Sequence, residues 1–149
     1  MTIVNDAGAA WSRTYRVADV PGVRVVVLSL GLACCAMEVE SAIRLGLLVP
    51  DEEAAAPSER TVVLVSGTVT GPLAPAVVSA VEAAVAEASP APVAVVAFGV
   101  CASTGGPYWD APTVVPGADR LVAVSAYVPG CPPRPEALIE ALLDKETVA

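Results

Sequence analysis

Four short apolar runs, each rich in β-branched Val or Leu-Val pairs, recur along the chain. They span residues 23–30, 61–66, 93–98 and 121–125. Continuous β-branched runs of this length are typical of strands that are buried on both faces of a parallel sheet. The pattern therefore predicts four strands at these positions.

Longer segments that mix apolar and polar positions separate the runs. Helices are predicted over residues 36–48, over residues 72–88, where Pro72 suits a first helical turn, and from about residue 134 to residue 144. A Gly- and Pro-rich loop is predicted over residues 99–117. This alternation predicts a single α/β domain with a mostly parallel, four-stranded sheet and helices on both faces, in a flavodoxin-like arrangement.

The first twenty residues show no clear period. We therefore expect an N-terminal arm over residues 1–20 and an α/β domain over residues 21–149. A chain of 149 residues has the usual size of one domain.

Composition narrows the possible functions. The net charge is −8 and Lys145 is the single lysine, so the chain offers no basic stripe for nucleic acid and little attraction to an anionic membrane surface. Histidine is absent, which excludes Ser-His-Asp and Cys-His catalysis and every His-ligated metal site. Any metal must then be held by Cys, Asp or Glu.

No membrane-spanning helix is expected, because the apolar stretch over residues 25–37 is too short to cross a bilayer. The segment before it carries Asp6, Asp19 and Pro21, which does not fit the basic region of a signal peptide. We therefore expect a chain that stays in the cytoplasm, where cysteines are kept reduced and are more often ligands than disulfides.

Each of the four cysteines follows the carboxyl end of a predicted strand. Cys34 and Cys35 follow the first strand, Cys101 the third and Cys131 the fourth. Right-handed crossovers bring the carboxyl ends of parallel strands to one edge of the sheet, where ligands bind. Four thiolates from three loops can meet there, and four is the number that a [4Fe–4S] cluster requires.

Other interpretations of the cysteines stay open on spacing alone. They can be small buried hydrophobes. A structural zinc site fits less well, because the paired C-x₂₋₄-C spacing is missing. A disulfide between Cys34 and Cys35 would be strained, and the C-x-x-C of dithiol redox enzymes is absent.

The remaining candidates carry weaker signals. Residues 67–71 lie between a strand and a helix but lack the phosphate-loop lysine, so a plain turn is favoured. Glu38 and Glu40 lie near the cysteines; they fit a solvated helix face, and Glu38 could alternatively couple protonation to reduction. Asp110 and Arg120 are expected to be surface or interface charges.

Four segments together resemble one known family. They are GLACCAMEVE (31–40), VLVSGTVTGPLAP (63–75), AFGVCASTGG (97–106) and VPGCPPRPEALIEALL (128–143). They are similar to the B, or 20 kDa, subunit of complex I, the NADH-quinone oxidoreductase, which is related to the small subunits of [NiFe] hydrogenases. The likeness covers about residues 23–144.

The resemblance implies one [4Fe–4S] cluster bound by Cys34, Cys35, Cys101 and Cys131, all of which are present. It implies a peripheral subunit on the cytoplasmic side of the cell membrane that passes electrons to quinone at the interface with a larger partner subunit. Between residues 39 and 60 the chain departs from the family, whose members usually have a longer segment with basic and aromatic residues.

Two alternatives accompany this expectation. One is the small subunit of a membrane-bound [NiFe] hydrogenase-type complex. The other is a scaffold or zinc-binding subunit without catalytic function that has kept the fold.

Overall fold

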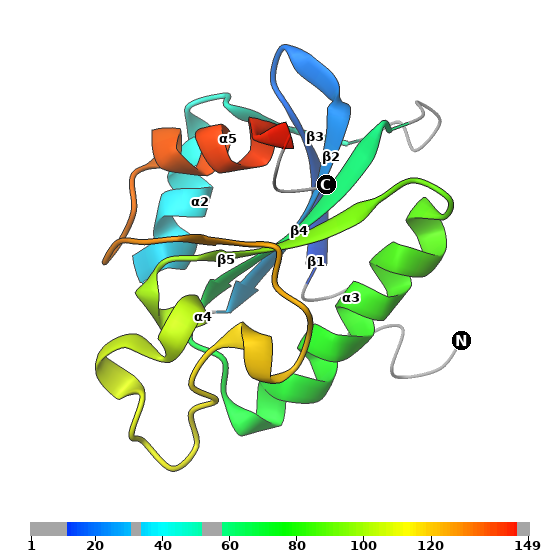
Figure 1. Cartoon of the computed structure of the whole chain (residues 1–149). Coiled ribbons are helices and arrows are strands. Elements are labelled where there is room, and N and C mark those ends of the chain that lie inside the picture. Colours follow the sequence, from blue (N-terminus) through cyan, green and yellow to red (C-terminus); the bar gives the residue numbers. More distant parts are fainter. Residues whose placement is uncertain (1–11, 31–33, 52–57, 146–149) are drawn as a thin grey trace.

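A single mixed sheet forms the centre of the molecule in the computed structural model, which describes residues 12–30, 34–51 and 58–145 (Figure 1). Six strands in these ranges lie in the order β3-β1-β2-β4-β5-β6. Their bounds are β1 Ser12–Val17, β2 Val20–Leu30, β3 Leu48–Pro50, β4 Arg60–Gly67, β5 Val93–Phe98 and β6 Ala126–Val128. The expected single α/β domain is confirmed, whereas the expected number of four strands is wrong.

The Val-rich runs form the middle of the sheet. β4 pairs in parallel with β2 on one side and with β5 on the other, and β6 pairs in parallel with β5. In β4 the side chains of residues 61–66 are all buried, whichever face they point to. This two-sided burial explains why the runs are apolar without alternation.

Two strands were not predicted from the sequence. β1 pairs antiparallel with β2 and with β3, and it lies within the segment that was expected to be an arm. Its sequence SRTYRV mixes charged and apolar residues and therefore does not look like a buried strand. The charged Arg16 is nevertheless buried, because its guanidinium group pairs with the Asp51 carboxylate. β3 has only three residues, too few for any period to be seen.

The fourth strand lies five residues later than predicted. Residues 118–120 form a 3₁₀ turn, and the strand begins only at Ala126. Leu121, Val122 and Val124 are apolar because they pack on the core, not because they pair in the sheet. Ser125 stands just before β6, where its N–H donates to the Val95 carbonyl (2.8 Å) and its hydroxyl oxygen accepts from the Val95 N–H (3.2 Å).

Helices cover both faces of the sheet. α2 (Cys34–Arg44) and α5 (Pro135–Leu143) lie on one face, and α3 (Ala74–Ala88) lies on the other, as Figure 1 shows. The short helix α4 (Val100–Thr104) falls inside the segment predicted to be a loop. Helix α2 begins two residues earlier than predicted, so that both tandem cysteines belong to its first turn.

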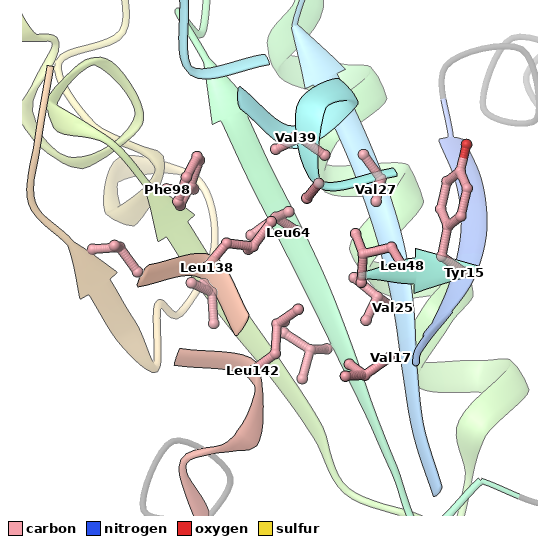
Figure 2. Close-up of a cluster of buried hydrophobic side chains, with 14 of the residues drawn as sticks. Tyr15, Val17, Val25, Val27, Val39, Leu48, Leu64, Phe98, Leu138 and Leu142 are labelled. Atoms are coloured by element: carbon pink, nitrogen blue, oxygen red, sulfur yellow. The ribbon is translucent and has the colours of Figure 1, made fainter. Parts of the chain in front are cut away.

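The two helical layers enclose two separate hydrophobic clusters. On the α2 and α5 side, Val25, Leu64 and Phe98 of the sheet pack against Leu138 and Leu142 (Figure 2). On the other face, Val63 and Val65 of β4 pack against α3. The helix contributes Val77, Val81 and Ala84 to this cluster. The sheet is therefore covered on both sides, as a parallel sheet requires.

The strand order changes direction between β2 and β4. β3 runs parallel to β2, because both are antiparallel to β1. The crossover through α2 thus leads from β2 to β3 on one side, whereas the crossover through α3 leads from β4 to β5 on the other. Right-handed crossovers in opposite directions place their helices on opposite faces, which is observed. The carboxyl ends of β2 and β4 accordingly border the point where open α/β sheets bind ligands.

Residues 71–88 form the one stretch among the described residues that is long and apolar enough to cross a membrane. No such stretch was expected from the sequence. Within it, Val77, Ala80, Val81 and Ala84 are buried in the domain core, and Glu82 is exposed. The core helix of a soluble protein can also meet these criteria of length and composition, although most side chains of this stretch are at least partly exposed.

Candidate metal centre

The tandem cysteines open helix α2 directly beyond β2. Cys34 is exposed, whereas Cys35 is completely buried against the α2 side of the core. Successive residues on a helix point in different directions, so the two thiols line different sides of one site.

Cys101 is the second residue of α4, directly beyond β5. It is 4% exposed. Gly99 precedes the helix with a φ of 89°, a conformation that L side chains rarely adopt. Gly105 ends the helix in the left-handed conformation, with its N–H donating to the Cys101 carbonyl (3.1 Å). The helix is thus one tight turn around the cysteine.

Cys131 lies in the turn after β6, and this turn is joined to the segment that carries Cys101. The Gly99 N–H donates to the Val128 carbonyl at 2.8 Å, and the Val100 N–H donates to the Gly130 carbonyl at 3.0 Å. These bonds continue the β5–β6 ladder past its last pair and fix the two loops relative to each other. Cys131 itself is exposed.

The four thiols lie within electrostatic range of one another. Burial, and after it the charges of Cys34, Cys101 and Cys131, raise the pKa of Cys35 to about 12. Burial also raises the pKa of Cys101, with smaller contributions from Cys131 and Cys34. Side chains from three separate segments of the chain therefore form one group at the carboxyl edge of the sheet.

The geometry is not that of a site for one ion. Among the described residues, no three Cys, Asp or Glu side chains lie close enough together to hold a single metal ion. A four-iron cluster is a larger body that takes one thiolate at each iron, so its ligands stand further apart.

Two glycines leave the room that such a body needs. A Cβ added at Gly99 would overlap the Sγ of Cys35, and a Cβ at Gly106 would lie 3.1 Å from the Sγ of Cys101. A side chain at either position would occupy the space beside a sulfur. The donor set is four soft thiols without imidazole, which suits iron–sulfur chemistry. The residues present fit a [4Fe–4S] cluster.

One residue at this edge was not predicted from the sequence. Thr68 follows β4 and is 5% exposed, and its side chain interacts with the thiol of Cys101. The sequence of residues 67–71 favoured a plain turn, with only a phosphate loop as the alternative. The available signal was the position of Thr68 at the carboxyl end of a central strand, the same signal that identified the cysteines.

The other candidate charges lie outside this group. Glu40 forms an ion pair with Arg13 at 3.3 Å, with the Arg13 side chain 64% exposed and the Glu40 side chain 39% exposed. Glu38 is half-buried on α2, and its coupling to reduction stays a prediction. Asp110 and Arg120 are exposed, as a surface or interface role requires.

Comparisons with known proteins point to one family. Residues 25–144 match the family described as NADH ubiquinone oxidoreductase, 20 Kd subunit. The chain is 44% identical over 140 residues to the NADH-quinone oxidoreductase B subunit numbered 2 of Streptomyces griseus, covering 89% of this chain and 53% of that protein. It is 42% identical over 140 residues to the corresponding B subunit numbered 1 of Salinispora tropica, covering 89% of this chain and 66% of that protein. The chain thus spans about half to two thirds of the length of these relatives.

A solved structure shares the fold. A chain from the membrane-bound sulfane sulfur reductase, an archaeal respiratory membrane complex, superimposes with a TM-score of 0.56 over 99% of this chain and 80% of that chain. The sequence identity is 24%, so this likeness concerns the fold.

Proposed function

Because the chain belongs to the family of the 20 kDa subunit of NADH ubiquinone oxidoreductase, we propose that it is an electron-transfer subunit that holds one [4Fe–4S] cluster. The ligands are Cys34, Cys35, Cys101 and Cys131. The observation that carries the proposal is the placement of the four thiols at one edge of the sheet, on the first turn of α2, on α4 and in the turn after β6.

The bound cluster supplies a site that accepts and releases one electron. The chain supplies the surroundings. Cys35 and Cys101 are buried and keep water from one side of the site, whereas Cys34 and Cys131 are exposed on the other. The buried side surrounds the site with a medium of low dielectric constant. Electron donors and acceptors can reach the site from its exposed side.

The open side is where a partner subunit and quinone belong in this proposal. Met37, one turn after Cys34, is 70% exposed, and Trp109, just beyond the glycine beside Cys101, is 64% exposed. Aromatic residues and Met are enriched in protein–protein interfaces relative to the rest of a protein surface. The family relationship supports the larger subunit of an NADH-quinone oxidoreductase as the partner. In this proposal the flavodoxin-like domain is a peripheral subunit that binds this partner on the cytoplasmic side of the membrane.

Metal analysis of the anaerobically prepared chain tests the proposal. We expect about four irons and matching acid-labile sulfide per chain, with an electron paramagnetic resonance signal on reduction. Zinc in place of iron, or no metal, would contradict the proposal and favour a scaffold. Cys101→Ser should lose most of the iron, while Thr104→Ser, an exposed change on the same helix, should keep it.

Assembly is tested separately from cluster binding. Co-purification with quinone-binding and NADH-oxidising subunits supports membership of a complex I-like enzyme. Co-purification with a nickel subunit that carries two C-x-x-C pairs would instead assign the chain to a hydrogenase-type complex.

A further inference from the structure

A buried hydroxyl without a partner lies beside the candidate centre. The Oγ1 of Thr68 is sealed from solvent, and it finds no hydrogen-bond partner of ordinary geometry among the described residues. The whole residue is 5% exposed. An unpaired buried hydroxyl costs free energy, so native structures rarely keep one without a reason.

The side chain of Thr68 faces the thiol of Cys101. A hydroxyl is a hydrogen-bond donor, and the sulfur of Cys101 is the group beside which the buried Oγ1 of Thr68 lies. The hydroxyl proton is thus available to the sulfur atom that the proposed function makes a ligand.

The segment around Thr68 holds the hydroxyl in place. Val69 is completely buried, and its carbonyl accepts from the Val115 N–H at 2.8 Å. The Gly71 N–H donates to the Thr113 carbonyl at 2.8 Å. On the other side, Gly67 pairs with Leu30 of β2, so closely that a Cβ at Gly67 would overlap the Leu30 carbonyl. The position of Thr68 is therefore fixed from both sides by the backbone.

We propose that Thr68 donates its hydroxyl hydrogen to the sulfur of Cys101 in the cluster-bound protein and thereby raises the reduction potential of the cluster. This inference rests on the proposed function. Reduction adds one negative charge, which spreads over the cluster and its thiolates. A donor to a ligand sulfur stabilises the reduced state more than the oxidised state, so it shifts the potential upward.

Redox titration of the cluster-loaded chain, followed by electron paramagnetic resonance, tests the inference. Thr68→Val keeps the shape of the side chain and removes the donor, so its potential should become more negative. A tenfold loss in the equilibrium constant for reduction, the upper end of what we expect, corresponds to about 59 mV for a one-electron couple. Thr68→Ser keeps a hydroxyl at this position, so its reduction potential should lie close to that of the wild type.

The controls separate a donor effect from a packing effect. Thr70→Val makes the same change two residues away, on a half-buried side chain, and should leave the potential unchanged. Thr68→Ala removes the donor without adding volume and provides the measurement if the Val variant does not fold. Equal potentials in cluster-loaded wild type, Thr68→Val and Thr68→Ala would overturn the inference alone. Failure of the wild-type chain to bind iron would instead overturn the proposed function.

Discussion

Gly99 lies against Cys35 so closely that no side chain fits between them. A Cβ at Gly99 would overlap the Cys35 sulfur, and the φ of 89° is itself unfavourable for an L residue. The end of β5 and the start of α2, more than sixty residues apart in sequence, therefore meet at a contact that only glycine permits.

This contact predicts that Gly99→Ala disrupts the centre. The added methyl group must displace Cys35 or the start of α4, so we expect loss of most bound iron and a lower melting temperature. Iron analysis and thermal unfolding measure the two effects. Gly46→Ala is the matched control, because Gly46 also has a positive φ (75°) but nothing within 4 Å. The control should lose about 1–2 kcal/mol for the backbone conformation and keep its iron.

A second prediction concerns Asp51, whose carboxylate joins two cationic side chains inside the protein. Its oxygens lie 2.9 Å from the Nε of Arg16 and 3.3 Å from the Nε of Arg24, and the Asp51 side chain is 3% exposed. Asp51→Ala leaves two guanidinium groups without this counter-charge. Breaking such a buried pair costs about 3–5 kcal/mol, which urea unfolding measures.

The solvated pair provides the comparison for Asp51. Glu40→Ala removes the partner of Arg13, and exposed pairs contribute about 0–1 kcal/mol. If both substitutions lower the free energy of unfolding by the same amount, the ion pairs of Asp51 do not stabilise the β1–β3 edge of the sheet.

The third prediction tests how α5 is held on the sheet. Leu142 is completely buried in the cluster shown in Figure 2, whereas its neighbour Leu143 is 36% exposed. Leu142→Ala should lower the free energy of unfolding by about 2–5 kcal/mol, because it leaves a cavity that the sheet cannot fill. Leu143→Ala should cost well under half as much. Equal losses would show that α5 packs through a different face.

The cluster-free protein should show the raised pKa of Cys35. Because the folded pKa is about 12 and the ordinary value is 9.0, the buried thiol stabilises the folded state fully below pH 9. As the pH rises from 9 towards 12, the unfolded state loses this proton and the folded state does not, so stability falls. The slope is at most about 1.4 kcal/mol per pH unit.

Measuring unfolding of the cluster-free chain against pH checks this slope. Alkylation at pH 8 gives an independent measure, since exposed Cys34 and Cys131 should react far faster than buried Cys35. A Cys35→Ser chain should lack the part of the pH dependence that this thiol causes. Rapid alkylation of all four cysteines in the folded chain would contradict the burial of the site.

The sequence predicted a strand correctly where burial alone determines the residue types. Burial on both faces makes β4 and β5 continuous apolar runs, and their positions were predicted to within a residue or so. Prediction from sequence failed where a second requirement, such as an ion pair or packing outside the sheet, also determines the residue types. Arg16 is buried in an ion pair, which hides β1 in the sequence. Leu121 and Val122 are apolar because they pack on the core, which led to a strand being predicted five residues before β6.

The same distinction applies to the candidate site. The four cysteines stood out in the sequence because each of them follows the carboxyl end of a predicted strand, where open α/β sheets bind ligands. Thr68 was not visible, because threonine in a turn has many ordinary explanations. Only the burial of its hydroxyl and its orientation toward Cys101 distinguish it.

The position of β6 at the far edge of the sheet has a consequence for biosynthesis. The sulfur atoms of the proposed centre leave the ribosome in three stages, and the last, Cys131, follows the sixth strand in chain order. Until that turn has been translated, the tandem pair in α2 has no counterpart on which a complete cube could close. Loading through all four sulfurs therefore follows synthesis of the last strand, so a subunit that holds its cluster through all four has already been translated beyond β6.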